Sequence, residues 1–117
     1  MESLVGVRER TMVGGLEQMV LLGVLHLEDG AYAVTIRQEL ERRSGKRVSR
    51  GALYTVLERL ESKGYIASHM GSPTPERGGR PKRFYRVTSS GVKALKSSKD
   101  TMVELWRGLE SVLGKIS

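Results

Sequence analysis

The 117-residue chain carries 20 Lys and Arg against 13 Asp and Glu, a formal net charge of +7 and a pI near 10.1. Hydrophobic residues make up 38% and charged residues 28%, which is typical of one globular domain and excludes a disordered chain. The charge indicates a polyanionic partner, either nucleic acid or an anionic membrane. Cysteine is absent, which excludes disulfides and thiolate metal sites and fits a reducing cytosol.

The N-terminal residues 1–13 are mixed in character, and we expect an arm or a short helix there. They lack the apolar run of a signal peptide, so a cytoplasmic protein is expected. The longest apolar stretch, Met19–Leu25, is far shorter than a membrane span. No membrane partner is therefore expected.

Three helices are predicted next. Residues Gly15–Leu27 are apolar nearly all round, which predicts a helix buried on most sides at the centre of the core. A turn over 28–30 precedes a second helix over Ala33–Arg43. A short basic turn at 46–48 then leads into the third helix, Ser49–Lys63. Two helices joined by a tight turn that contains glycine are typical of a helix-turn-helix.

The helix over Ser49–Lys63 has two different faces. One face is an apolar stripe made of Leu53, Val56, Leu57 and Leu60, and the opposite face holds Gly51, Thr55, Glu58 and Ser62. Ser49 stands at the N-cap position and Gly64 follows the last turn as a C-cap glycine does. A helix with a small-residue outer face and a basic leading end suits a DNA major groove. An ordinary surface helix is the alternative.

A basic β-hairpin is predicted over residues 65–88. Its strands are Tyr65–His69 and Arg83–Thr88, and the Gly- and Pro-rich residues 71–82 between them form a loop. Four cations lie at this tip against the single acid Glu76: Arg77, Arg80, Lys82 and Arg83. They would release counterions at each neutralised phosphate. A solvated loop is the alternative, but a hairpin directly after a helix-turn-helix indicates a winged helix.

Residues 89–117 are predicted to form one long helix. Apolar residues recur there at alternate steps of three and four, with a single breach at Lys99: Val92, Leu95, Met102, Trp106, Leu109, Leu113 and Ile116. We expect this seam to pair with its copy in a second chain. The alternative is that the helix folds back over the first helix of its own chain.

The expected fold class is mainly α with a small β-hairpin: a winged helix-turn-helix plus a long C-terminal dimerisation helix. The expected domains are an arm or short helix at 1–13, a DNA-binding domain at 14–88 and a dimerisation helix at 89–117.

Two blocks of the sequence are distinctive in this order: VSRGALY over 48–54 with LERLESKGYI over 57–66, and GGRPKRFYRVT over 78–88 followed by Gly91. Through these blocks the sequence resembles the PadR family of winged-helix transcriptional regulators. The resemblance covers about residues 16–96, and the length matches the small subgroup with one C-terminal helix. Many members have proline where this chain has Arg50.

The resemblance implies a homodimer that binds a near-palindromic operator in double-stranded DNA, usually as a repressor, and that is often released by a small molecule or a stress signal. Some members bind flat aromatic compounds between their C-terminal helices. Trp106 is the candidate ligand contact here, although packing of Trp106 in the dimer core is the favoured interpretation.

The expected DNA-contacting residues lie on the third helix, just before it and on the wing: Arg47, Ser49, Arg50, Gly51, Tyr54, Thr55, Glu58, Arg77, Arg80, Lys82 and Arg83. The chain has no Asn, and Gln18 and Gln38 lie elsewhere, so amide reading of adenine is excluded on this helix. We expect sparse base reading, with Arg50 on guanine, Thr55 on a thymine methyl and Glu58 on cytosine, and a large share of recognition by DNA shape.

No enzyme is expected, because two distant His, no Cys and no recognisable carboxylate pair give no catalytic constellation. No cofactor or metal is expected either. The alternative function is a winged-helix module that binds RNA or an acidic protein through its basic wing.

Overall fold

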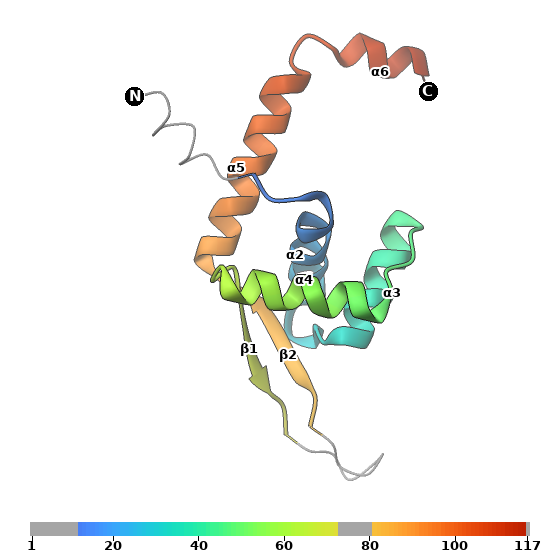
Figure 1. The fold of residues 1–117 in the computed structure, drawn as a ribbon. Coiled ribbons are helices and arrows are strands. Elements are labelled where there is room, and N and C mark those ends of the chain that lie inside the picture. Colours follow the sequence, from blue (N-terminus) through green and yellow to red (C-terminus); the bar gives the residue numbers. More distant parts are fainter. Residues whose placement is uncertain (1–11, 73–80, 117) are drawn as a thin grey trace.

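The computed structural model describes residues 12–72 and 81–116 (Figure 1). Most of the expected arm and the tip of the wing, including Arg77 and Arg80, lie outside these ranges. The elements follow in the order α2 (Gly15–Leu27), η1 (Glu28–Gly30), α3 (Ala33–Ser44), α4 (Arg50–Ser62), β1 (Ile66–Met70), β2 (Arg83–Val87), α5 (Ser89–Trp106) and α6 (Glu110–Ile116). The predicted mainly helical class with one hairpin is confirmed.

Helix α2 lies at the centre of the body and contacts α3, α4, β2 and α5. Its inner face places Val20, Leu21 and Val24 in the core. The expected burial on most sides is confirmed, and the exposed sector is narrow: it holds Gly15, His26 and two apolar residues, Leu22 at 45% exposed and Leu25 at 43% exposed. Neighbouring elements therefore cover most of α2, and one exposed sector remains in the single chain.

Helices α3 and α4 form the predicted helix-turn-helix. Gly45 follows α3 as its C-cap, and its φ of 74° is left-handed backbone that glycine adopts without strain. The turn is fixed by Arg37 of α3, whose Nε donates a hydrogen bond of 3.0 Å to the carbonyl of Val48. Ser49 then caps α4, because its Oγ accepts a hydrogen bond of 3.1 Å from the N–H of Ala52. The predicted start of α4 is thus confirmed with Arg50 in its first turn.

The C-terminus of α4 ends in a Schellman motif. The N–H of Tyr65 donates to the carbonyl of Leu60 at 2.9 Å, and the N–H of Gly64 donates to the carbonyl of Glu61 at 3.0 Å. Gly64 has a φ of 79°, as its predicted C-cap role requires. The chain therefore turns sharply out of α4 and into β1.

Strands β1 and β2 pair antiparallel, with Ser68 opposite Tyr85 and Met70 opposite Arg83. The buried Tyr85 also donates its backbone N–H to the carbonyl of Ala31, at 2.9 Å. That bond attaches the hairpin to the segment between α2 and α3. The predicted hairpin is confirmed, and its base is joined to the helical body.

The C-terminal region is not one continuous helix. Helix α5 begins at Ser89 as predicted, but it ends at Trp106, and α6 starts again at Glu110 after Gly108, whose φ is 87° (Figure 1). The first half of α5 packs on the body through Ala94 and Leu95, whereas the residues after Ser98 leave it. No helix within the described ranges is both long and apolar enough to cross a lipid bilayer.

Candidate nucleic-acid interface

The outer face of α4 is open, and its inner face is packed. Leu53, Leu57 and Leu60 are almost fully buried, which fixes how the helix is rotated against the body. The candidate base- and phosphate-contacting residues of this helix all point outward and are exposed: Arg50, Gly51, Tyr54, Thr55 and Glu58. A Cβ atom added at Gly51 would meet nothing within 4 Å, so the surface at the leading end of α4 is unobstructed.

The basic turn before α4 is exposed as well. The side chain of Arg47 is 86% exposed, and its Nε lies 3.8 Å from the carboxylate of Glu41. An ion pair this long and this exposed is weak in water, so Arg47 keeps most of its capacity to pair with another anion. Its side chain projects from the turn that positions the N-terminus of α4.

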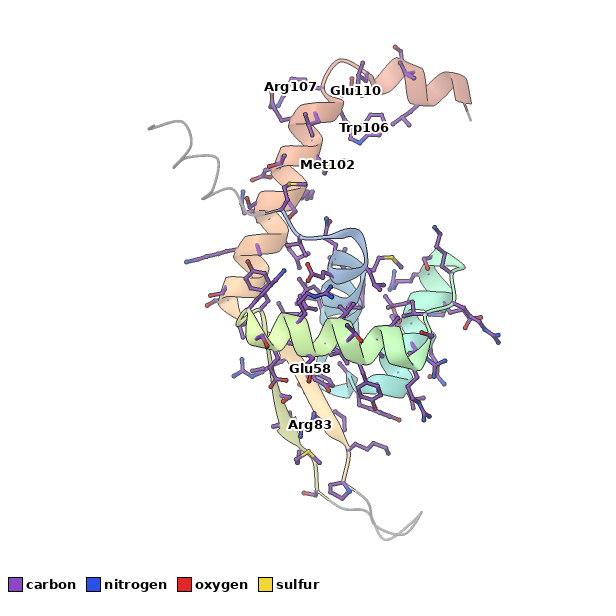
Figure 2. The ribbon with its side chains drawn as sticks, in the orientation of Figure 1. Glu58, Arg83, Met102, Trp106, Arg107 and Glu110 are labelled. Carbon is purple, nitrogen blue, oxygen red and sulfur yellow. The ribbon has the colours of Figure 1, made fainter. Side chains whose placement is uncertain are left out.

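A groove of about 560 Å³ lies between α4 and the base of the wing. Its lining comes from α4, from the start of α3 and from β2 with the two residues before it: Tyr32, Ala33, Val34, Tyr54, Thr55, Leu57, Glu58, Glu61, Pro81, Lys82, Arg83 and Tyr85. Figure 2 shows Glu58 on the side of α4 nearer the hairpin and Arg83 on the strands beyond it. The structure therefore brings part of the candidate set to one concave surface: Tyr54, Thr55 and Glu58 of the helix with Lys82 and Arg83 of the wing. Arg47, Ser49, Arg50 and Gly51 lie outside the lining of this groove.

Aromatic contacts at the wing base were not anticipated from the sequence. The rings of Tyr32 and Phe84 meet edge to face with centroids 5.4 Å apart, and Phe84 also stacks on His69 at 5.8 Å. The ammonium of Lys82 lies 4.9 Å from the centroid of the Tyr32 ring. These contacts hold the wing base against the start of α3. The sequence does show aromatic residues on both sides of the basic loop, but their contacts can be predicted only when the strand register is known.

Helix α4 is also held at its C-terminal end by an acid from α2. Glu17 is only 6% exposed, and its carboxylate accepts hydrogen bonds of 3.1 and 3.3 Å from the ammonium of Lys63, with Arg59 at 3.8 Å. Burial alone would raise the pKa of Glu17, but the Lys63 and Gly14 hydrogen bonds and the nearby cations outweigh it and lower that pKa. The C-terminal end of α4 is thereby tied to the core helix.

Acidic residues on α3 are paired with arginines. Glu39 accepts hydrogen bonds from Arg43 and from Arg42, and these two contacts lower the pKa of its carboxyl group. Among the described residues, no group of three or more His, Cys, Asp or Glu is placed to hold a metal ion.

The residues of the expected dimer seam are largely exposed. Val92, Met102, Trp106, Leu109 and Leu113 have between 39% and 47% of their surface open, whereas Leu95 is buried in the body of its own chain. Figure 2 shows Trp106 on the inner side of the bend between α5 and α6, with Arg107 on the outer side. The side chain of Ile116 is outside what the structure describes.

Comparisons with known proteins agree on one family. Residues 21–97 match the transcriptional regulator PadR-like family. The transcriptional regulator Rv3488 of Mycobacterium tuberculosis is 37% identical over 90 residues, which cover 75% of this chain and 79% of that protein. A PadR family transcriptional regulator from Eggerthella lenta is 26% identical, with a TM-score of 0.64 over 95% of this chain and 90% of its own.

A likeness in fold alone extends to a PadR family regulator from Clostridium difficile, which is 24% identical with a TM-score of 0.61 over 87% of this chain and 98% of its own. The family match spans the helix-turn-helix, the hairpin and the first half of α5, and so includes every residue that lines the groove. Members of this family regulate transcription through DNA and are not enzymes. The chain belongs to the PadR-like family of transcriptional regulators.

Proposed function

We propose that this regulator is a homodimer that recognises a near-palindromic operator in double-stranded DNA and represses transcription by occupying it. One observation carries the proposal: the exposed outer face of α4 and the base of the wing line a single groove. A major groove that receives α4 would therefore bring the flanking phosphates against the wing.

The candidate residues divide into two roles. Arg50, Thr55 and Glu58 face outward along α4, where their end groups suit guanine, a thymine methyl and cytosine. Phosphate contacts come from cations on either side of α4, namely Arg47 before the helix and Lys82 and Arg83 on the wing. The hydroxyl of the half-exposed Tyr54 is a further phosphate contact. Gly51 leaves room for the backbone to approach DNA closely. Ser49 acts indirectly, since its hydroxyl is engaged in capping α4.

The exposed apolar side chains of α5 and α6 support the homodimer. A monomer rarely leaves so many large apolar residues exposed over one stretch of chain, and such a surface marks an interaction site. Pairing these helices about a twofold axis would place two copies of α4 in successive major grooves, about 34 Å apart. The same pairing would enclose Trp106, either as packing for the dimer core or as the wall of a site for a flat aromatic effector.

The direct test is a gel shift with the DNA upstream of the protein's own gene, repeated from about 50 to 200 mM salt. We expect binding that weakens steeply and linearly in log Kd against log salt, because each neutralised phosphate releases counterions. A Kd that does not change with salt concentration would contradict phosphate neutralisation by the wing. Equal competition by RNA favours the RNA-binding alternative and overturns the operator assignment.

A further inference from the structure

A hydrogen-bonded chain joins the recognition helix to the wing. The Oγ of Ser68, on β1, donates to the carboxylate of Glu61, on α4, at 2.8 Å. The same oxygen accepts a hydrogen bond of 3.0 Å from the guanidinium of Arg83, on β2. Ser68 thus lies between the last turn of α4 and a candidate phosphate-binding cation.

The register of the hairpin brings these groups together. Ser68 pairs with Tyr85 and Met70 pairs with Arg83, so Ser68 and Arg83 are diagonal neighbours on one face of the sheet. Tyr85 is buried on that face, which turns it toward the body. Glu61 and Arg83 both line the groove between α4 and the wing, so these hydrogen bonds run along the wall of that groove.

The chemistry of the three groups fixes the direction of both bonds. An arginine side chain only donates and an ionised carboxylate only accepts, whereas a serine hydroxyl has one proton to give and lone pairs to receive. Ser68 must therefore direct its proton to Glu61 and its lone pairs to Arg83. Threonine preserves this pattern, and residues without a hydroxyl abolish it.

We propose that Ser68 is a positioning residue for DNA binding, which orients the guanidinium of Arg83 toward the phosphate backbone when α4 enters the major groove. This inference rests on the proposed function. One NH1 donor of Arg83 is engaged by Ser68, and the guanidinium has five donors in total, so most of them stay available for phosphate oxygens. Holding the side chain in place lowers the conformational entropy lost on binding.

The chain of bonds contributes little to folding, because its members are exposed and water competes for each bond. A positioning role therefore predicts an effect on DNA affinity without a matching effect on stability. Two substitutions separate a role in positioning from a role in stability. Ser68→Thr keeps the hydroxyl, and Ser68→Val introduces a side chain of nearly the same shape as Thr but without a hydroxyl. Thr and Val are both β-branched and suited to a strand.

Each variant is titrated against the upstream DNA fragment and against an unrelated duplex of equal length, with thermal unfolding as the check on folding. We expect Ser68→Thr to bind like the unchanged protein, and Ser68→Val to bind both duplexes about 3- to 10-fold more weakly. The salt slope of Ser68→Val should also fall by up to about 0.9, the value of one lost phosphate contact. Ser90→Ala, which removes an exposed hydroxyl from α5, serves as the control.

A double-mutant cycle with Arg83→Ala completes the test. In that background Ser68→Val should have no further effect on affinity, because the side chain that Ser68 orients is gone. Equal affinities and slopes for Ser68→Thr and Ser68→Val, or a Ser68→Val loss that persists without Arg83, would overturn the positioning role while leaving operator binding intact. Failure of the unchanged protein to bind either duplex would overturn the proposed function itself.

Discussion

Gly91 occupies the closest approach between α5 and the turn that follows α4. A Cβ atom placed there would lie 2.3 Å from the carbonyl oxygen of Tyr65 and 2.7 Å from Cγ1 of Val87. The Tyr65 oxygen has no freedom to retreat, since it accepts a hydrogen bond of 2.9 Å from the N–H of Thr88. Thr88 in turn caps α5 and donates its hydroxyl to the carbonyl of Gly64. Only a residue without a side chain fits this junction.

We therefore predict that Gly91→Ala destabilises the fold by about 2–3 kcal/mol, the upper part of what overpacking costs, because one of the clashes is with backbone. Urea denaturation should show a lower midpoint with an unchanged slope. Gly15→Ala is the matched control, because a Cβ atom at Gly15 in the first turn of α2 meets nothing within 4 Å. Equal midpoints for the two variants would contradict the close approach.

Arg50 and Lys82 should differ in what their loss does to DNA recognition. Arg50 lies on the exposed face of α4, so Arg50→Ala should cost about 1–3 kcal/mol at one base position and relax the preference there. Lys82 lies on the wing base, so Lys82→Ala should weaken all duplexes about equally. Affinities for a panel of single-base operator variants, measured at one salt concentration, separate the two patterns. A uniform loss for Arg50→Ala would move it from base reading to phosphate contact.

At the scale of elements, Glu17 is the group that fastens α2 to the far end of α4. The folded-state pKa of this carboxyl group is lowered, so its stabilising effect is complete above its ordinary pKa of about 4.5. That effect is lost as the pH falls through the lower folded-state pKa, where Glu17 becomes protonated. Its partners Lys63 and Arg59 are about half exposed, which limits the contribution to the order of 1 kcal/mol.

We predict that Glu17→Gln lowers the free energy of unfolding by about that amount at neutral pH and by progressively less below pH 4.5. Chemical denaturation of both proteins between pH 3 and 7 measures the difference. Glu104→Gln is a suitable control, since Glu104 pairs with Arg107 on the exposed surface of α5. A stability difference that stays constant across this pH range would show that the charge of Glu17 is not what matters.

Elements specified by local signals were predicted well from the sequence. Ser49 and Gly64 mark both ends of α4 because caps depend on adjacent residues. The contact of Ser68 with Glu61 and Arg83 could not be predicted from the sequence, because it depends on the strand register and on how the hairpin packs against α4. The position of the exposed sector of α2 could not be predicted either, since apolar composition does not tell which faces its own chain covers.

The bend after Trp106 was missed for a different reason. The apolar spacing of the seam continues through residues 107–109, and periodicity alone therefore predicts an unbroken helix. Gly108, with a φ of 87°, interrupts it, and the N–H of Gly108 is satisfied by the carboxylate of Glu110 at 3.0 Å. A glycine in the interior of a helix costs about 1 kcal/mol relative to alanine, which is enough to decide such an exposed junction.

Gly108→Ala should accordingly favour a continuous helix. Alanine gains about 1 kcal/mol of helix propensity and is strained at positive φ, so both effects act against the bend. We expect increased helicity by circular dichroism at 222 nm, with the wing and α4 unchanged. Gly114→Ala, at an open position within α6, controls for propensity without a bend. Helicity that rises no more in Gly108→Ala than in Gly114→Ala would show that the bend persists.

At the scale of the whole molecule, the proposed DNA-binding and pairing surfaces point in different directions. The hairpin extends from one end of the body and α5 leads away from the other, with α6 beyond it (Figure 1). The exposed apolar strip of this region consists of Val92, Met102, Trp106, Leu109 and Leu113. A substitution in this strip is therefore remote from the groove between α4 and the wing. In the proposed dimer, such a substitution would act on DNA binding through the pairing of subunits, which would link two α4 helices and raise their joint affinity for an operator with two half-sites.

Met102→Glu combined with Leu109→Glu tests that link, because it places two charges in the exposed apolar strip. Sedimentation should show a monomer, since an unpaired carboxylate is costly to bury in a subunit interface. Affinity for a duplex with a single half-site should remain unchanged, whereas affinity for the full operator should fall by about 100-fold or more as avidity is lost. Ser90→Glu, on the same helix but outside the strip, should stay dimeric and bind both duplexes normally. A double variant that remains dimeric would exclude this strip as the pairing surface, and a monomer that keeps full operator affinity would show that pairing does not contribute to recognition.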